Sequence, residues 1–359
     1  MLIAPEINIF THYSKIQFLS KLSIVKLKNG GENGIRTHER VSPLHAFQAC
    51  ALNHSAISPE LFSTLHYIYK LNNVFIFMKK ILITGTSGFL GSNILRSLVK
   101  SNTVYATTRK KIISNHKNLK YIFFYNHSDL IKKLKKIRVN TVIHCATHYI
   151  KTHRSNDIPK ITKSNIEFGN IILENLNKMR VKKFINFCTV WQNYNSKKNQ
   201  PHNLYAASKN AFIEIVNYYK KVNRKTNFYN IYIADTFGDN DRRKKLVNIL
   251  KNGKGNKKKI LIESRNLALN LLDVKDIINA ILIIVKKKIK DGDYNLINNK
   301  NFNIFKLIKR LNKNKKFKKK IIWAGSKKIN NKIFKIKKLP YWKPKYSNFE
   351  DLTNFIIGK

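Results

Sequence analysis

The chain has 359 residues, of which 43% are hydrophobic, so it is long enough for two domains or for one large α/β unit with a buried core. Its formal net charge of +51 would suit a nucleic-acid or anionic-surface partner. However, Lys, Asn and Ile are abundant along the whole chain, as a genome poor in G and C would produce, so we interpret the charge as compositional and expect no specific nucleic-acid partner.

The cysteines and the apolar runs bear on where the protein works. Cys50, Cys145 and Cys188 fit no disulfide framework, which favours a reducing compartment. No apolar run reaches the length of a membrane span, and the N-terminus lacks the ordered regions of a secretory signal. No set of His and Cys residues has the paired spacing of a metal site. We therefore expect a cytoplasmic protein with no membrane partner and no metal.

Residues 1–77 differ from the rest of the chain because they show no sustained hydrophobic period. Back-translation of the segment Gly34–Arg40 gives the complement of the T-arm of a tRNA gene, and the stretch to Ala56 resembles the remainder of such an antisense translation. We therefore expect residues 1–77 to be a disordered, non-native leader, and the true start to be Met78.

A Gly-rich turn follows the first periodic segment. The apolar run 81–83 predicts a buried parallel strand, and residues 93–99 carry apolar side chains at helical spacing. Gly85, Gly88 and Gly91 lie between them, and such a turn is typical of a dinucleotide-binding site, because it lets backbone N–H groups approach a pyrophosphate. No Lys-Ser or Lys-Thr pair follows the last glycine, which disfavours a P-loop.

From Met78 onward, strand and helix patterns alternate, which predicts a Rossmann-type, doubly wound parallel α/β sheet with helices on both faces. The further expected strands are 103–107, 121–124, 141–145, 184–187, 228–234 and 271–274. The further expected helices are 130–137, 166–178, 204–222 and 277–285. The Lys-rich tail past Asp293 is expected to add no further regular element and to end in a loop with aromatic anchors. We expect a dinucleotide-binding domain over 78–238 and a small substrate-binding lobe over 239–359, with 267–290 returning to the first domain.

The end of the second strand bears on cofactor choice. An acidic residue at this place takes the ribose hydroxyls of NAD, whereas here Thr108 is followed by Arg109 and Lys110. A cation suits the additional phosphate of NADP, and an uncharged residue removes the repulsion that an acid would impose. NADP(H) is therefore favoured, with NAD(H) as the alternative.

Tyr205 and Lys209 form the sharpest pair in the chain. Their i, i+4 spacing places both side chains on one face of a helix, where the ammonium can lower the pKa of the phenol so that Tyr205 exchanges a proton. Thr189 lies at the end of the preceding apolar strand, from which its hydroxyl could hold a substrate oxygen against Tyr205. These three residues are the expected catalytic group.

Together these residues resemble the extended short-chain dehydrogenase/reductases that modify nucleotide-sugars, the NAD-dependent epimerase/dehydratase family. The resemblance runs from Met78 to the C-terminus. It rests on the segments 84–91, 144–147, 165–174, Thr189, 205–209, 235–241, 273–276 and 342–344. It implies a large nucleotide-binding domain, a small C-terminal lobe and a sugar nucleotide in the cleft between them.

The resemblance also implies where cofactor and substrate bind. The implied cofactor contacts are Gly85, Thr86, Ser87, Gly88, Phe89, Leu90, Gly91, Thr108, Arg109, Asn126, Ala146, Thr147, Asn165, Tyr205 and Lys209. The implied substrate contacts are His148, Gln192, Asp235, Arg242 and Lys245. Asn126 replaces the usual adenine-binding Asp of the family, and Asp235 stands where many members have Asn.

One departure limits the reaction. Family dehydratases carry an Asp-Glu pair after the catalytic Thr, whereas this chain has Val190 and Trp191, so we do not expect dehydration. The expected enzyme is an NAD(P)-dependent 4-epimerase or 4-ketoreductase of a nucleoside-diphosphate sugar, in deoxysugar or surface-polysaccharide synthesis, and the resemblance is compatible with a homodimer. The alternative is a non-catalytic sugar-nucleotide or nucleic-acid-binding protein that kept the fold.

Overall fold

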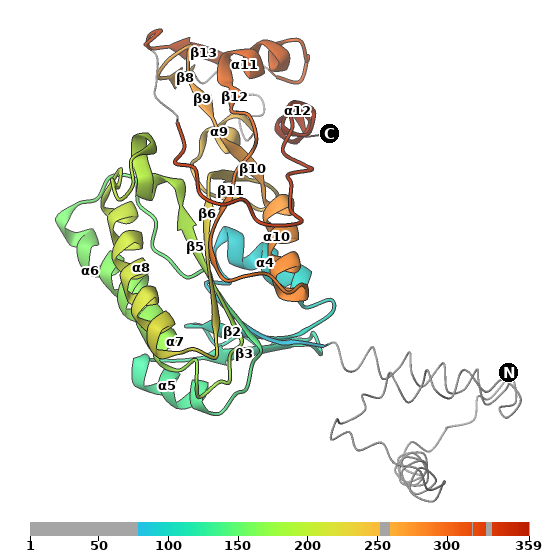
Figure 1. The fold of residues 1–359 in the computed structure, drawn as a ribbon. Coiled ribbons are helices and arrows are strands. Elements are labelled where there is room, and N and C mark those ends of the chain that lie inside the picture. The colour runs from blue at the N-terminus through green and yellow to red at the C-terminus, as the bar shows by residue number, and fades with distance from the viewer. Residues whose placement is uncertain (1–77, 252–258, 318, 328–331, 359) are drawn as a thin grey trace, which may run out of the picture. The chain divides into compact units, whose positions relative to one another are not determined.

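The computed structural model describes residues 78–251, 259–317, 319–327 and 332–358, so our expectations for residues 1–77 lie outside the described residues. Its centre is a seven-stranded parallel sheet with the strand order β11-β6-β5-β4-β1-β2-β3 (Figure 1). The strands are β1 (Lys80–Thr84), β2 (Thr103–Thr108), β3 (Leu119–Phe123), β4 (Thr141–His144), β5 (Lys183–Thr189), β6 (Asn227–Ile233) and β11 (Gly292–Leu296). This confirms the predicted Rossmann-type fold.

Helices cover both faces of the sheet, so apolar side chains on both sides of its strands are buried. On one face Ile81 and Ile83 pack with residues of α4 (Phe89–Leu98) and α10 (Val274–Lys286). On the other, Leu82 packs with residues of the helices α5 (His127–Lys135), α7 (Phe168–Glu174) and α8 (Leu204–Val222). Figure 1 shows these two helical layers on opposite sides of the strands. Successive residues of β1 thus serve opposite cores, as the pleat of a strand requires.

The strand order places a switch point beside β1. The chain runs outward from β1 through β2 to β3 on one side, and from β4 through β5 to β6 on the other. In open α/β sheets, ligands bind at the carboxyl ends of the strands where the strand order reverses. The Gly-rich turn after β1 and the segment after β4 both lie at this point.

Residues C-terminal to β6 also form a smaller core. It contains three helical segments, α9 (Leu246–Lys251), α11 (Ile304–Asn312) and α12 (Phe349–Ile357). Three two-stranded sheets complete it: β7 (Asp235–Phe237) with β10 (Leu271–Asp273), β9 (Ala268–Leu269) with β12 (Phe302–Asn303), and β8 (Lys259–Ile262) with β13 (Lys320–Trp323). Buried Phe237, Leu250, Leu307 and Leu352 belong to one hydrophobic cluster.

The expectation that no regular element follows Asp293 was wrong. β11 joins the central sheet beside β6, and β12, α11, β13 and α12 follow it. The composition of this tail is dominated by lysines, but its apolar residues still recur at helical spacing. In α11, the residues buried on one face are Ile304, Leu307, Ile308 and Leu311. The aromatic anchor of the final loop is present, because Trp342 Nε1 donates to the carbonyl of Asp276 over 2.9 Å.

The helix expected over 166–178 also differs in its bounds. It begins with α6 (Ile158–Thr162), passes through a π-helical turn (Lys163–Glu167) and ends with α7 at Glu174. Such a turn inserts one residue into the helical ladder and often occurs at functional sites. Within the described ranges, no helix is both long enough and apolar enough to cross a membrane.

Candidate active site

The Gly-rich turn packs directly against the end of β4. Gly85 has φ +70°, and a Cβ on it would lie 2.6 Å from the backbone N of Ala146. A Cβ on Gly91 would lie 2.2 Å from the carbonyl oxygen of Gly85, so both positions exclude a side chain. The N-cap of α4 is Gly88, which has no side chain to bond the first-turn N–H groups. The turn therefore fits a phosphate at the helix N-terminus.

The other predicted residues of this segment share the same turn. Thr86 and Ser87 lie between β1 and α4, and Phe89 and Leu90 form the first turn of the helix. In the described part of the chain, no group of three or more His, Cys, Asp and Glu residues could hold a metal ion.

The residues predicted to choose the cofactor lie at the ends of β2 and β3, which are neighbours in the sheet. Thr108 Oγ1 donates to the carbonyl of Lys110 and accepts from its N–H, both over 3.1 Å, and Arg109 is exposed. Asn126 caps α5, because its Oδ1 accepts from the backbone N of Asp129 over 3.0 Å. Its side chain thus has a structural partner at the place where the family has Asp.

Asn165 ties the segment after β4 to α8. It comes from the π-helical turn and is 1% exposed. Its Oδ1 accepts from the hydroxyl of Thr147 over 3.0 Å and from the backbone N of His148 over 2.6 Å, and its Nδ2 donates to Ser208 Oγ over 2.9 Å. Ala146 is fixed separately, since its N–H donates to Thr84 Oγ1 over 3.1 Å. The structure therefore gives Asn165 a supporting position behind Thr147.

The helix α8 carries Tyr205 and Lys209 one turn apart. It begins where Asn203 Oδ1 accepts from the N–H of Ala206 over 3.0 Å. The side chain of Tyr205 is partly exposed, whereas Lys209 is 3% exposed and its Nζ lies 3.5 Å from Asn186 Oδ1. Tyr205 is therefore accessible at the start of α8, whereas Lys209 is buried one turn further along the helix.

Thr189 ends β5 and is held by Gln192. The Thr189 N–H donates to Gln192 Oε1 over 2.8 Å, and Gln192 Nε2 donates to Asn210 Oδ1 over 2.8 Å. Gln192 is fully buried. Although we predicted Gln192 as a substrate residue, both ends of its amide have protein partners, and these fix Thr189 relative to α8.

The ionisation of this group differs from our expectation. Burial raises the pKa of Tyr205, and the hydrogen bond with Thr147 and the charge of Arg243 offset only part of this. The structure thus contradicts the expected lowering of the pKa of the phenol: desolvation of the phenolate dominates, and Lys209 is not among the groups that lower this pKa. Burial also lowers the pKa of Lys209.

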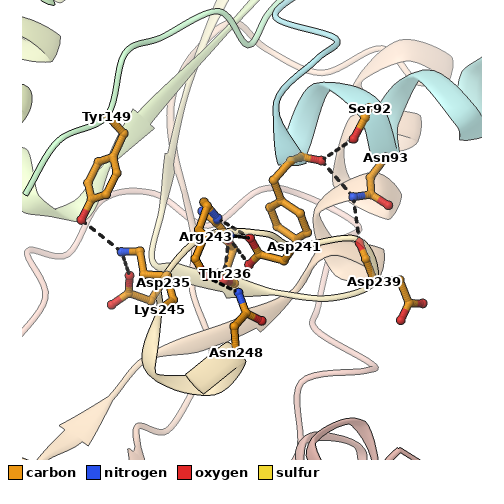
Figure 2. A network of polar contacts seen from close by, with 11 residues as sticks. Ser92, Asn93, Tyr149, Asp235, Thr236, Asp239, Asp241, Arg243, Lys245 and Asn248 are labelled. Atoms are coloured by element: carbon orange, nitrogen blue, oxygen red, sulfur yellow. Dashed lines mark hydrogen bonds and ion pairs between the residues drawn. The ribbon is translucent and has the colours of Figure 1, made fainter. Parts of the chain in front are cut away.

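A second cluster, which we call the aromatic cluster, consists of Tyr149, Trp191, Asp235 and Lys245. The Lys245 Nζ lies 2.8 Å from Asp235 Oδ1, 4.8 Å from the ring centroid of Tyr149 and 5.0 Å from that of Trp191. Figure 2 shows Lys245 between Asp235 and the hydroxyl of Tyr149. A cavity of about 80 Å³, lined in part by Trp191 and Asp235, adjoins it.

Sequence reasoning missed Tyr149 and Trp191 as site residues. Each lies within a few residues of the carboxyl end of a parallel strand, Tyr149 after β4 and Trp191 after β5. That position was the available signal, because ligands of this sheet type bind at that edge. His148 beside them has a buried Nε2 atom with no hydrogen-bond partner in the part of the chain that the structure describes.

Arg243, rather than the predicted Arg242, turns inward from the loop after β7. Its guanidinium pairs with both carboxylate oxygens of Asp241 over 2.7 Å and donates to the carbonyl and hydroxyl oxygens of Thr236 over 2.8 Å (Figure 2). It also lies 4.3 Å from the ring centroid of Phe89 in the first turn of α4. Arg242 is exposed. Burial opposes ionisation of Asp241, but Arg243 holds the pKa of this carboxyl below its usual value.

Comparisons with known proteins bear on the family and the fold. The model of the NAD dependent epimerase/dehydratase family matches residues 81–297. The chain is 27% identical over 219 residues to a CDP-abequose synthase of Yersinia pseudotuberculosis, covering 60% of this chain and 75% of that protein. It is 28% identical over 261 residues to a dTDP-D-glucose 4,6-dehydratase of Dictyostelium discoideum, covering 62% of this chain and 58% of that protein. Among solved structures, the UDP-N-acetylglucosamine 4-epimerase of Methanobrevibacter ruminantium M1 has a TM-score of 0.64 at 18% identity, covering 78% of this chain and 97% of that one, which shows a shared fold.

Proposed function

Because the chain belongs to the NAD dependent epimerase/dehydratase family, whose members modify nucleotide-sugars, we propose that it reduces a ketone at carbon 4 of a nucleoside-diphosphate sugar. The observation that carries this proposal is the placement of Tyr205 and Lys209 on one helix, at the carboxyl edge of the sheet where Thr189 ends β5. Tyr205 gives the proton, Thr189 positions the oxygen and Lys209 supplies positive charge beneath them.

The fit of a dinucleotide rests on the turn after β1. Gly85 and Gly91 leave no room for side chains, and the uncapped start of α4 offers N–H groups to the pyrophosphate. The bound nicotinamide cofactor supplies the hydride. NADP(H) is the favoured form, because Thr108 carries no charge to repel an additional phosphate and Arg109 is exposed beside it.

The chain's own residues complete the reduction. Since burial raises the pKa of Tyr205, its phenol is protonated at neutral pH and donates its proton to the carbonyl oxygen as carbon 4 gains the hydride. The hydroxyl of Thr189 holds the same oxygen, which restricts the ketone to one orientation. The ammonium of Lys209 then stabilises the phenolate until a proton from solvent restores it.

Dehydration is not part of the proposal. An acid that protonates a leaving hydroxyl would follow Thr189, and Val190 and Trp191 cannot donate in this way. The carboxylate of Asp235 is the acidic member of the nearby aromatic cluster, and it is already paired with Lys245 over 2.8 Å. The site therefore favours hydride and proton transfer without loss of a hydroxyl.

The aromatic cluster suggests how the sugar is held. Tyr149 and Trp191 offer ring faces to an apolar side of a deoxysugar, and Lys245 offers a cation to the diphosphate. The relative named CDP-abequose synthase supports a cytidine diphosphate as the carrier. We place the product in deoxysugar supply for a surface polysaccharide.

Purified full-length protein, given NADPH and a CDP-linked 4-keto-deoxysugar, tests this function. We expect one nicotinamide to be oxidised for each ketone reduced, and Tyr205→Phe to lose most of the turnover. If the protein instead interconverts two 4-hydroxy sugars and retains its cofactor, the reaction is epimerisation rather than reduction. The fold is compatible with either reaction. No turnover of any nucleotide-sugar would overturn the proposal.

A further inference from the structure

Polar side chains form a row across the middle of the central sheet. Asn186 on β5 is paired in register with Asn230 on β6, and Asn230 is paired with Asp293 on β11. Asn230 Nδ2 donates to Asp293 Oδ1 over 2.9 Å, and Asn186 Nδ2 donates to Asn230 Oδ1 over 3.0 Å. The row ends at α8, where Lys209 Nζ lies 3.5 Å from Asn186 Oδ1. Three strands thus connect an exposed carboxylate with the buried lysine.

The two amides lie in an apolar setting. Asn186 is fully buried and Asn230 is 5% exposed, and Phe184 and Phe228, two positions earlier on the same strands, belong to the core beneath α8. A buried amide destabilises a protein unless its donors and acceptor find partners. Each amide in this row satisfies the next, so the row functions as a unit.

The two ends fix the direction of every hydrogen bond in the row. A carboxylate only accepts, so Asn230 must present its NH₂ group to Asp293 and its oxygen to Asn186. Asn186 must then present its NH₂ group to Asn230 and its oxygen to α8. An ammonium only donates, so Lys209 requires the oxygen that this order provides. Flipping either amide would set two donors against each other.

We propose that Asp293 is a positioning residue for Lys209: through Asn230 and Asn186 it keeps an amide oxygen directed at the ammonium and so keeps Lys209 charged beneath Tyr205. This inference rests on the proposed function for the role of Lys209 in the reaction, but the orientation of the amides does not depend on turnover. Removing Asp293 frees both amides to flip, and a flipped Asn186 would point NH₂ at the ammonium.

The surroundings of Lys209 explain why this oxygen matters. No ion pair of Lys209 occurs within the residues that the structure describes, and burial lowers its pKa. The titratable groups near it are His144 and Cys145 at the end of β4, Cys188 on β5, Tyr205 on α8, and Tyr232 on β6 beside Cys188. Burial lowers the pKa of His144 to about 3 and raises the pKa of Cys188 to about 12, and it also raises those of Cys145, Tyr205 and Tyr232. All five are therefore neutral near neutral pH, and none replaces the row.

The experiment compares Asp293→Leu and Asp293→Asn with Asp291→Asn as a matched control. Asp291 lies two residues away in sequence and pairs with Lys220 over 2.7 Å at the surface, so its variant removes the same charge without touching the row. Thermal unfolding first shows that each variant is folded. The titration of the Lys209 ammonium is then followed by heteronuclear NMR without substrate, its signal assigned by its loss in Lys209→Met.

We expect Asp293→Leu to lower the pKa of Lys209 by about half to one unit, and to shift the alkaline limb of the kcat profile by the same amount. KM for the sugar nucleotide should stay unchanged. Asp293→Asn should give a smaller shift, because its oxygen can still accept from Asn230. Asp291→Asn should match wild type in both measurements.

The outcomes separate this proposal from the proposed function. If Asp293→Leu shifts the titration of Lys209 but wild type turns over no nucleotide-sugar, the positioning role of Asp293 is supported and the proposed reaction is contradicted. If wild type turns over the sugar normally and Asp293→Leu changes neither the titration of Lys209 nor the pH profile of kcat, the positioning role is contradicted and the proposed reaction is supported. Equal shifts in the Asp291→Asn control would also overturn the proposal, since the effect would then be one of net charge.

Discussion

Tyr149 packs edge-on against Tyr205, with ring centroids 5.0 Å apart and ring planes at 86°. The two residues come from different elements, since Tyr149 follows β4 and Tyr205 lies in the first turn of α8. The contact restricts the direction of the Tyr205 ring, while Asn165 holds the segment before Tyr149 from behind. Tyr149 is therefore a structural neighbour of the proposed proton donor.

The first prediction separates the ring of Tyr149 from its hydroxyl. Tyr149→Phe keeps the edge-on contact and loses only the 3.4 Å contact with Lys245, so we expect kcat within about three-fold of wild type. Tyr149→Ala removes the ring that packs against Tyr205. It should lower kcat by roughly 10- to 100-fold, because the proton donor Tyr205 would then be less well oriented. Steady-state kinetics on both variants measures this. Equal losses in the two would assign the effect to the hydroxyl instead.

The second prediction concerns Lys245 and uses its neighbour as a control. Lys245 is partly buried in the aromatic cluster, whereas Lys244 is exposed, and both substitutions to Met remove one charge. If Lys245 contacts the diphosphate, Lys245→Met should weaken binding of the sugar nucleotide by about ten-fold or more, the value of one charge-assisted hydrogen bond. Lys244→Met should bind as wild type does. Calorimetric titration with the nucleoside diphosphate measures both, and similar affinities would remove Lys245 from the binding site.

The third prediction follows from a buried carboxyl at the start of α10. Burial raises the pKa of Asp273 from its ordinary value of 3.8 to about 6. The folded protein thus binds the Asp273 proton more tightly than the unfolded chain does. The contribution of Asp273 to the free energy of unfolding therefore falls as pH rises from 3.8 to about 6, and it remains unfavourable at higher pH. Asp273 Oδ1 accepts from the N–H of Lys275 over 2.7 Å, a cap that Asn can also form.

Asp273→Asn should therefore raise the free energy of unfolding by about 1–2 kcal/mol near pH 8 and leave it nearly unchanged near pH 4. Denaturant unfolding at the two pH values measures the difference. A loss of the same size at both would show that the charged carboxylate stabilises the helix more than its burial costs.

The fourth prediction concerns cofactor choice. Arg109 is exposed and directly follows the end of β2. Losing one charge-assisted phosphate contact should cost roughly 1.5–3 kcal/mol, so Arg109→Ala should weaken NADP(H) binding by about ten-fold or more and leave NAD(H) binding alone. Fluorescence titration with both cofactors tests this. Equal affinities for the two in wild type, unchanged in the variant, would contradict the assignment.

Local patterns predicted most of the sheet because each strand and helix repeats its own period. The buried run 81–83, the turn glycines and the bounds of α8 all follow from neighbouring residues. β11 was not predicted because lysines dominate the tail and because only three residues of the strand, Tyr294, Asn295 and Leu296, are buried.

Contacts between strands distant in sequence could not be predicted in this way. Asn186, Asn230 and Asp293 share a row only because three strands pair in one register, which no local period encodes. Which of Arg242 and Arg243 turns inward could not be predicted for a related reason, since only the fold decides which one meets Thr236 and Asp241.

The last prediction concerns the charge, because it separates an enzyme from a nucleic-acid-binding protein. The chain has 70 Lys and Arg residues but only 19 Asp and Glu residues. Weak, salt-sensitive binding to DNA is expected of any surface with such an excess of positive charge. If the charge is compositional, that binding should vanish near physiological salt, while hydride transfer stays essentially intact.

Tyr205→Phe makes the distinction sharp, since it removes one hydroxyl from the proposed site and leaves the surface charge unchanged. Turnover should fall by roughly two to four orders of magnitude, the usual contribution of a positioned acid. Retention on nucleic acid at each salt concentration should match wild type. Both properties are measured on the same preparations. Tight, sequence-selective binding at physiological salt, together with no turnover of any nucleotide-sugar by wild type, would instead favour the nucleic-acid-binding protein.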